Sequence, residues 1–326
     1  EQKGVARIEK KEAFTLIEID NLVKTYAEHV AVDHLSITVE PGKIYGFLGP
    51  NGAGKSTTMN IITGYLGATS GTVTINGHDI FKEPEEAKKC VGYLPEIPPL
   101  YADMTVLEYL NFVAELKKLQ KSLRKRYVEE AMETTGILDV KNRMIRNLSK
   151  GYRQRVGFAQ AILGYPEIII LDEPTVGLDP KQIIEIRDLI KKLGEKHTVI
   201  LSSHILTEIS AVCAHVFIIS KGKLVASDST ENLLDQMSGA QEIELTVRSE
   251  ADRAKALLEE IEYVDHADLK DAKEGSILIR AKSGNDIREE VFRLMAENHI
   301  PVLEMRTVTK SLEDVFLQIT QEGGNQ

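Results

Sequence analysis

The chain of 326 residues has no tryptophan, two cysteines and no long apolar run. Cys90 and Cys213 are too few for a disulfide framework and are typical of a reducing compartment, so we expect both to be packing residues. The longest apolar stretches, such as residues 168–171 (IIIL), are far shorter than the ~20 residues that span a bilayer. These absences argue against a disulfide-stapled secreted domain and a membrane-spanning chain, and predict a chain that is soluble by itself.

The acidic excess is confined to the last third of the chain. Residues 1–230 contain 29 Lys+Arg and 29 Asp+Glu, whereas residues 231–326 contain 11 and 21, which accounts for the net charge of −10. A surface of this sign repels nucleic acid and anionic lipid, so we expect no nucleic-acid partner. The change in composition near Thr230 also predicts a domain boundary, with an accessory domain over 231–326.

The first residues are not expected to belong to the fold. Residues 1–13 are charged, lack an apolar core and do not begin with methionine, so they do not predict a signal peptide. We expect residues 1–14 to be a disordered or non-native tail outside the fold.

A glycine-rich loop at residues 49–56 (GPNGAGKS) is the strongest motif. It lies between an expected buried strand at 44–48 and an expected helix at 57–63, which is the context of a Walker A phosphate loop. Its glycines let backbone N–H groups point inward to hold phosphate, Lys55 adds a charge for the β- and γ-phosphates, and Ser56 offers a hydroxyl to Mg²⁺. A chance glycine-rich turn is the alternative, which the flanking pattern disfavours. The loop therefore predicts ATP and Mg²⁺ as ligands, with contacts from Asn51, Gly52, Ala53, Gly54, Lys55, Ser56 and Thr57.

Two carboxylates end the apolar strand expected at 167–172. Asp172 is placed to hold Mg²⁺ directly or through water, and Glu173 to polarise an attacking water as general base. Alone, the pair is equally consistent with a solvated acidic turn. After a complete Walker A loop, it predicts a Walker B element.

A third motif, residues 148–152 (LSKGY), precedes a helix expected from about Arg153 to Leu163. Ser149 and the N–H of Gly151 would lie at its N-terminus and form a second anion site. One chain cannot wrap two outward-facing sites around one phosphate, so this site is expected to serve a partner's nucleotide. The simpler interpretation, favoured by the sequence alone, makes Ser149 an ordinary helix cap.

The remaining pattern predicts an α/β fold in two domains. Alternating strands at 15–19, 30–39 and 72–75, the last followed by an Asn76-Gly77 hairpin turn, indicate an antiparallel layer. Residues 85–163 read as a helical insertion, and apolar strands at 167–172, 198–203 and 216–220 indicate a parallel sheet. The tail reads as βαββαβ plus a helix at 311–320, a small α+β ferredoxin-like unit.

Together, the motifs resemble those of ATP-binding-cassette (ABC) ATPases, the nucleotide-binding subunits of ABC transporters, over about residues 15–230. Gly177-Leu178-Asp179 matches the D-loop of that family and His204 its switch histidine. The resemblance implies a P-loop NTPase cassette in which Tyr26 stacks on adenine, Asp179 meets the opposite subunit and His204 contacts the γ-phosphate. Taken singly, Tyr26 would be read as a core aromatic and His204 as a helix-capping residue.

Two departures from the family pattern point to one branch of it. The signature has Lys150 and Tyr152 where the family commonly has glycine and glutamine, and Glu96 occupies the place of the Q-loop glutamine. A carboxylate at that place is still able to accept Mg²⁺ or orient water. These departures, with residues 311–316 (SLEDVF), resemble the branch that energises ABC-2 type exporters.

The resemblance implies an ATPase that drives a separate membrane permease by ATP-dependent dimerisation with a second ATPase subunit, identical or not. It would lie peripherally on the cytoplasmic face of the membrane. An importer ATPase, or a soluble ABC protein acting on ribosomes or DNA, remains the alternative. A run of six basic residues at 117–126 is interpreted either as a solvated helix face or as a contact with anionic headgroups.

Overall fold

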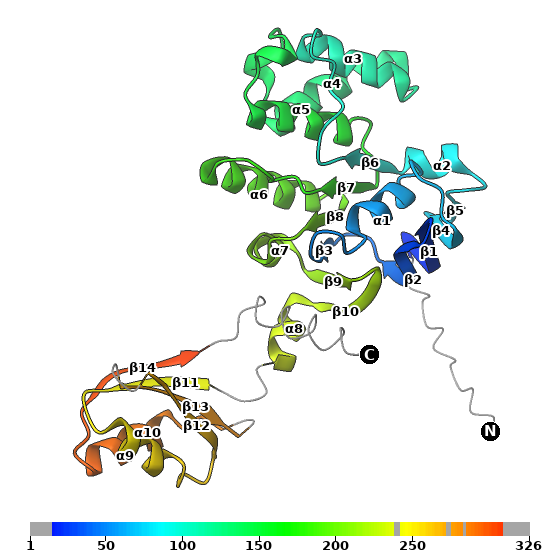
Figure 1. Ribbon diagram of the computed structural model, residues 1–326. Helices are drawn as coiled ribbons and strands as arrows, with labels where there is room; N and C mark the ends of the chain where they lie inside the picture. Colours follow the sequence, from blue (N-terminus) through cyan, green and yellow to red (C-terminus); the bar gives the residue numbers. More distant parts are fainter. Residues whose placement is uncertain (1–14, 238–241, 272–274, 283–284, 309–326) are drawn as a thin grey trace, which may run out of the picture. The chain divides into compact units, whose positions relative to one another are not determined.

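A computed structural model describes residues 15–237, 242–271, 275–282 and 285–308 (Figure 1). The contacts divide the chain into two compact units, and the boundary in the sequence falls between Ser229 and Thr230. The expected tail at 1–14 and the expected helix at 311–320 lie outside the described residues.

The first unit is built on a mixed six-stranded sheet. All neighbouring strands are parallel except β10, which pairs antiparallel with β9. Strands β7 and β8 are buried along their whole length, as expected for apolar strands covered on both faces. The order across the sheet is β10 (Lys223–Ser229), β9 (His215–Ser220), β3 (Ile44–Leu48), β8 (Thr198–Ser203), β7 (Ile168–Asp172) and β6 (Val91–Leu94).

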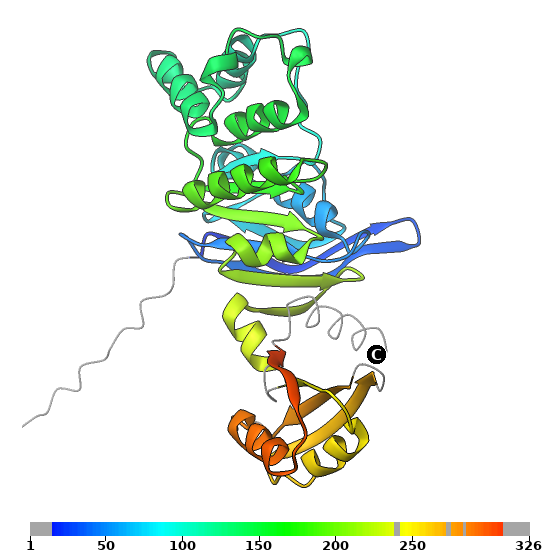
Figure 2. The same ribbon diagram turned by 90° about the vertical axis from the view of Figure 1, so that its left-hand side faces the viewer.

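An antiparallel sheet packs against this core, as the alternating segments predict. Asn76 and Gly77 both have positive φ, 49° and 83°, the backbone that a tight hairpin between β4 and β5 requires. Helix α1 (Lys55–Ile62) contacts β7 and β2 and contributes buried residues to the apolar core that joins the two sheets (Figures 1 and 2). The order in this sheet is β2 (His29–Val39), β1 (Ile17–Tyr26), β4 (Ser70–Ile75) and β5 (His78–Asp79).

Helices cover the mixed sheet and project from one end of it. Helices α6 and α7 pack on β8, and α7 also packs on β3. Helices α3, α4 and α5 pack against one another and form the helical insertion, at the top of Figure 1. The helices of the first unit are α1 (Lys55–Ile62), α2 (Pro84–Lys89), α3 (Val106–Leu116), α4 (Lys121–Thr135), α5 (Lys150–Ile162), α6 (Pro180–Gly194) and α7 (Leu206–Val212), with short 3-10 turns at Leu138–Val140 and Ile145–Asn147.

The helical expectation for residues 85–163 holds for α2 but was wrong at residues 91–94. Residues Val91–Leu94 form β6, which pairs in parallel with β7 at the edge of the main sheet. The strand has four residues and lies between a helix and a proline-rich loop, too short for its alternation to stand out. Because β6 belongs to the sheet, the loop that follows it, with Glu96, leads directly from the core into the insertion.

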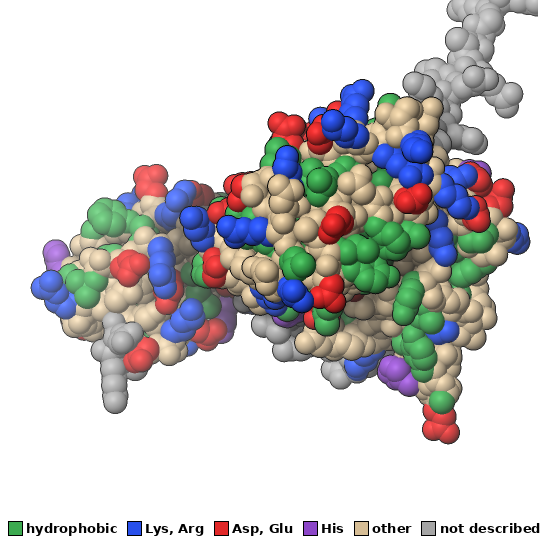
Figure 3. All heavy atoms as spheres, turned by 90° about the horizontal axis from the view of Figure 1, so that it is seen from above, with side chains coloured by type: hydrophobic (Ala, Val, Ile, Leu, Met, Phe, Trp, Pro, Cys, Tyr) green, Lys and Arg blue, Asp and Glu red, His purple; other side chains and the backbone are tan. Residues whose placement is uncertain are grey.

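The basic run at 117–126 is largely paired within the chain. The Lys117 ammonium donates to the carbonyl oxygens of Gln160 and Leu163 at 3.0 and 2.9 Å, at the C-terminal end of α5. Lys118 pairs with Glu85, Arg124 with Glu115, and Arg126 with Glu130. Seen from above, basic and acidic side chains are interspersed with apolar ones (Figure 3). These contacts favour the interpretation as a solvated helix face.

The second unit has the predicted βαββαβ order. Its four strands are all antiparallel in the order β12-β13-β11-β14, and α9 and α10 supply buried residues to one apolar core. This is the ferredoxin-like arrangement. The elements are α8 (Thr230–Met237), β11 (Glu242–Val247), α9 (Ala251–Leu258), β12 (Val264–Asp271), β13 (Ser276–Ala281), α10 (Arg288–Glu297) and β14 (Val302–Val308).

Among the described residues, neither cysteine forms a disulfide. Cys213 is buried, and burial raises its pKa. Within the described ranges, no helix has the length and apolar character to cross a membrane.

Candidate nucleotide-binding site

The phosphate loop connects the end of β3 to the start of α1, and two of its glycines have no room for a side chain. A Cβ on Gly49 would lie 2.4 Å from the carbonyl oxygen of Ile219, and one on Gly54 would lie 2.4 Å from that of Ala31. Gly54 also has φ 102°. Helix α1 begins without a side-chain cap or an acidic residue in its first turn. Its first N–H groups therefore point toward the loop without a side-chain competitor, as an anion site requires.

Lys55 is the first residue of α1, and its side chain is 5% exposed. Its ammonium donates to the carbonyl oxygen of Gly49 at 2.7 Å and lies 3.5 Å from Oε1 of Glu173. A buried ammonium requires such partners, because burial without them is costly. The two contacts hold the charge over the phosphate loop.

The two carboxylates at the end of β7 have different surroundings. Asp172 is 3% exposed and accepts hydrogen bonds from the hydroxyl of Ser202 and, at 3.3 Å, from that of Ser56. Glu173 is 7% exposed, and its Oε2 lies 2.9 Å from Nδ1 of His204. Asp172 therefore lies beside the serine of the phosphate loop, and Glu173 lies between a lysine and a histidine.

Glu173 has a left-handed backbone, with φ 47°. Its N–H donates to the carbonyl oxygen and to the hydroxyl of Ser202, both at 3.2 Å. A non-glycine residue in this conformation costs about 1–3 kcal/mol and persists where its surroundings hold it. Ser202 thus contacts the carboxylate of Asp172 and the backbone of Glu173. The sequence analysis did not identify Ser202 as a site residue. The only indication of its role was that two hydroxyl residues, Ser202 and Ser203, immediately precede His204.

One open cleft collects most of the predicted residues. His29, Ala31, Pro50 and Val176 also line it, although the sequence did not single them out for the site. The predicted residues that line the cleft are Tyr26, Asn51, Gly52, Gly54, Lys55, Ser56, Thr57, Glu96, Glu173 and His204. Tyr26 is 46% exposed at the end of β1, so it is not a core aromatic.

The other predicted residues are not part of this lining. Ala53 is buried in the loop. Ser149 caps α5, with its hydroxyl accepting from the N–H of Tyr152, and Asp179 caps α6, with its carboxylate accepting from the N–H of Gln182 at 2.9 Å. A Cβ on Gly151 would lie 2.8 Å from the Gln182 side chain, so α5 and α6 approach closely there. Within the chain, Ser149 therefore acts as a helix cap. Its contact with a nucleotide bound to a partner subunit stays a prediction.

The oxygen ligands at the cleft fit a magnesium ion that arrives with a nucleotide. Over the part of the chain that the structure describes, no group of three or more His, Cys, Asp or Glu side chains is placed to hold a metal by itself. Ser56 and Asp172 together offer a hydroxyl and a carboxylate, and Glu96 lines the same cleft. Mg²⁺ binds through one or two carboxylates while keeping waters and phosphate oxygens, which matches this sparse set.

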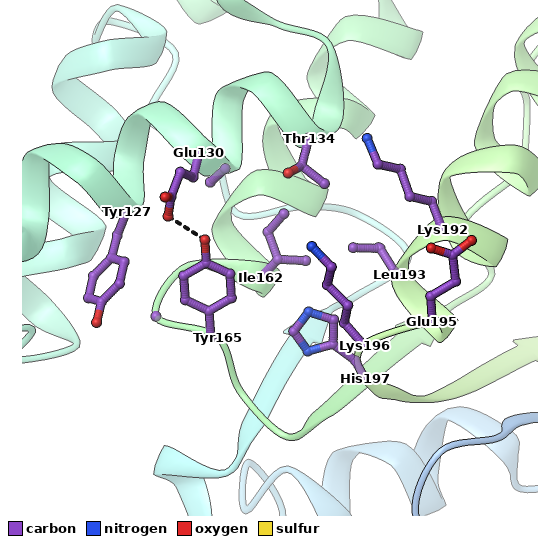
Figure 4. A pocket seen from close by; sticks show the side chains of 12 residues that line it. Tyr127, Glu130, Thr134, Ile162, Tyr165, Lys192, Leu193, Glu195, Lys196 and His197 are labelled. Carbon is purple, nitrogen blue, oxygen red and sulfur yellow. Dashed lines mark hydrogen bonds between the residues drawn. The ribbon is translucent and has the colours of Figure 1, made fainter.

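A second cavity shares no residue with the cleft. It lies between α4, the end of α5 and the end of α6, where Tyr165 donates a hydrogen bond to Glu130 beside Lys196 and His197 (Figure 4). His197 Nδ1 lies 2.7 Å from the carbonyl oxygen of Pro166. This cavity lies at the interface between the helical insertion and the sheet core, and none of the predicted site residues line it.

Comparison with known sequences identifies the family. A family described as ABC transporter matches residues 32–176. The Bacitracin transport ATP-binding protein BcrA of Bacillus licheniformis is 37% identical over 311 residues, which cover 95% of this chain and 98% of that protein. The Linearmycin resistance ATP-binding protein LnrL of Bacillus subtilis (strain 168) is 30% identical over 306 residues, 94% of this chain and 98% of that protein. The Nod factor export ATP-binding protein I of Cupriavidus metallidurans is 32% identical over 71% of this chain and 76% of its own length.

Solved structures agree. An ATP-binding subunit of an ABC transporter aligns with a TM-score of 0.63 and 28% identity, covering 69% of this chain and 94% of that one. An ABC transporter cassette in its ADP conformation aligns with a TM-score of 0.60 and 28% identity, covering 67% and 92%. The predicted cassette fold is thereby confirmed. The chain belongs to the ABC transporter family, as an ATP-binding subunit with ATPase activity.

Proposed function

We propose that this ATPase drives export through a separate membrane permease of the ABC-2 type. Support comes from similarity that extends over nearly the whole chain, accessory unit included, to relatives named for bacitracin transport and linearmycin resistance, and from the shorter match to a Nod factor export protein. The chain would act at the cytoplasmic face of the membrane, bound to the permease.

The observation that carries the catalytic assignment is the position of Glu173 between Lys55 and His204 in one cleft. Glu173 accepts the proton of the attacking water, Lys55 and the loop N–H groups stabilise charge on the phosphates, and His204 supports the γ-phosphate. Ser56 and Asp172 would hold Mg²⁺, with Glu96 as a further oxygen ligand. The ion would supply positive charge that neutralises the phosphates.

Two copies of the cassette complete the site. Tyr26 exposes its ring at the edge of the cleft, where it stacks on adenine. Ser149, Gly151 and Asp179 do not line the cleft of their own chain, so we assign them to the nucleotide of a second ATPase subunit, in a homodimer or a heterodimer. A dimeric bacterial ABC transporter cassette, which aligns with a TM-score of 0.60 and 25% identity, supports this arrangement.

Glu173→Gln tests the catalytic assignment. The variant keeps size and hydrogen bonding and loses the base, so we expect ATP binding to remain, turnover to be lost, and ATP to trap a dimer on size-exclusion chromatography with light scattering. Glu167→Gln, at an exposed carboxylate just before β7, is the matched control and should behave as wild type. Hydrolysis by Glu173→Gln at a near wild-type rate would overturn the assignment.

Transport direction requires the permease. The membrane protein that co-purifies with the tagged chain is identified by mass spectrometry and co-expressed with it, and inside-out vesicles are prepared with labelled bacitracin as the probe. An exporter accumulates the probe inside these vesicles when ATP is added, and Glu173→Gln abolishes the accumulation. ATP-driven loss of preloaded probe from the same vesicles would indicate import and contradict the proposal.

A further inference from the structure

Glu208 is a buried carboxylate with no part in the mechanism above. It lies on α7 and is 4% exposed. Its Oε2 accepts a hydrogen bond from the hydroxyl of Thr175 and another, at 3.1 Å, from the hydroxyl of Ser203. Burying a carboxylate is costly unless hydrogen bonds compensate, so these two hydroxyls are what makes the position tolerable.

The two hydroxyls come from the two segments that carry the proposed catalytic groups. Thr175 is two residues after Glu173, and Ser203 immediately precedes His204. Ser203 is itself fixed, because its hydroxyl also accepts from the N–H of Ile205 at 3.0 Å. One carboxylate oxygen therefore joins the loop after β7 to the last residue of β8. The Glu173–His204 contact at 2.9 Å is a second link between these two segments.

The segment 173–175 is held from its other side as well. Gln154 on α5 is 5% exposed, and its amide donates to the carbonyl oxygen of Pro174 at 2.9 Å. Helix α5 is the one that begins with the signature motif. The left-handed Glu173 is thus followed by Pro174, which is hydrogen-bonded to α5, and by Thr175, which is hydrogen-bonded to α7.

We infer that Glu208 is a positioning residue, which sets the distance between the Glu173 carboxylate and the His204 imidazole by tying Thr175 to Ser203. It does not line the cleft and contacts no reacting group. The inference rests on the proposed function, because it assumes that Glu173 and His204 do the chemistry. A displacement of about 1 Å between such groups costs up to about a hundredfold in rate, so a fixed separation has a kinetic value.

A purely structural role makes a different prediction. Glu208 also lies in the first turn of α7, where an acidic side chain interacts favourably with the helix dipole. In that case, its removal lowers stability and leaves turnover per folded molecule unchanged. The two roles are separable by measuring kcat, ATP affinity and the melting temperature on the same preparations of the full chain.

The central variants are Glu208→Leu, Glu208→Gln and Thr175→Val. We expect Glu208→Leu to lower kcat by about tenfold to a hundredfold with the Kd for ATP within about threefold of wild type. Glu208→Gln should recover most of that loss, because its amide oxygen still accepts from a hydroxyl. Thr175→Val tests the same link with an isosteric side chain if Glu208→Leu does not fold. Ser210→Ala, an exposed hydroxyl on the same helix, is the matched control and should leave kcat unchanged.

A double-mutant cycle gives the sharpest result. If Thr175 and Glu208 act as one link, the double variant loses no more turnover than Glu208→Leu alone. Additive losses, or a Glu208→Leu protein with kcat within twofold of wild type, would overturn the inference. So would losses in kcat and ATP affinity by the same factor, since that indicates a general loss of structure.

Failure of the inference is distinguishable from failure of the proposed function. If Glu173→Gln abolishes turnover while the Glu208 and Thr175 variants hydrolyse normally, only the positioning role is wrong. If Glu173→Gln hydrolyses ATP normally, the catalytic assignment is wrong, and the positioning role is overturned with it.

Discussion

Alanine at Gly54 should be far more damaging than alanine at Gly52, two residues earlier in the same loop. Both glycines have positive φ, 102° and 80°. A Cβ at position 54 would lie 2.4 Å from the carbonyl oxygen of Ala31, whereas a Cβ at position 52 would have no atom within 4 Å. The pair therefore separates backbone strain from steric exclusion.

The magnitudes follow from these two terms. Gly52→Ala lowers the free energy of unfolding only by the cost of a left-handed L-residue, about 1–2 kcal/mol. Gly54→Ala lowers it by at least that amount. In addition, β2 or α1 must shift to relieve the contact with a backbone atom, which adds about 1–3 kcal/mol, as overpacking typically does. At about 2–4 °C per kcal/mol for a domain of this size, we expect melting temperatures lower by about 2–8 °C for Gly52→Ala and about 4–20 °C for Gly54→Ala.

The assay is thermal unfolding of both variants and wild type, followed by fluorescence and circular dichroism, with and without ATP. Position 54 should show the larger loss in the absence of nucleotide, since the clash lies within the chain. Equal losses, or a larger loss for Gly52→Ala, would refute the argument that contact with Ala31 is what requires glycine at 54.

Three further outcomes are expected. Ser149→Arg should suppress hydrolysis in the dimer and leave ATP binding by the monomer intact; an equal loss of monomer affinity, measured by titration with a fluorescent nucleotide, would place Ser149 in its own chain's site. Deletion of residues 240–326 should leave a folded cassette that binds ATP, because the phosphate-contacting motifs precede Thr230; an insoluble product contradicts this. Glu96→Gln should shift the Mg²⁺ dependence of hydrolysis and Glu96→Ala should also weaken stimulation by the permease; wild-type Mg²⁺ titrations and full stimulation in both variants would make Glu96 an ordinary surface acid.

The parts of the site that sequence predicted are those built from consecutive residues. The phosphate loop is recognisable because backbone N–H groups hold phosphate only when glycines stand at fixed places, and Gly49 and Gly54 are those at which a Cβ would clash. The hairpin at Asn76-Gly77 is predictable for the same reason, since few other residues adopt two successive left-handed conformations. Because a special backbone conformation admits few residue types, the residue type at such a position indicates the conformation.

The parts that sequence did not reveal depend on pairs that are far apart in the chain. Ser202 is 30 residues from Asp172, and Glu208 is 33 residues from Thr175. A serine in a strand and a glutamate in a helix have many ordinary roles, and nothing in the neighbouring residues indicates a partner. Strand β6 was missed for a related reason, because four residues owe their strand conformation to pairing with β7.

The register of β7 depends both on consecutive residues and on pairs that are far apart in the chain. Along the sheet, Leu48 stands opposite Ser203, and Asp172 opposite Ser202, so the ends of β3, β7 and β8 are level. Strand β7 is buried on both faces, so alternation of apolar and polar residues cannot fix its register. The carboxylates at its end are able to do so. Asp172 and Glu173 are buried and find hydrogen-bond partners in Ser56, Ser202 and His204 only in this alignment, and a slip by one residue would leave at least one buried charge without them. The residues assigned to catalysis therefore also specify the sheet that positions them.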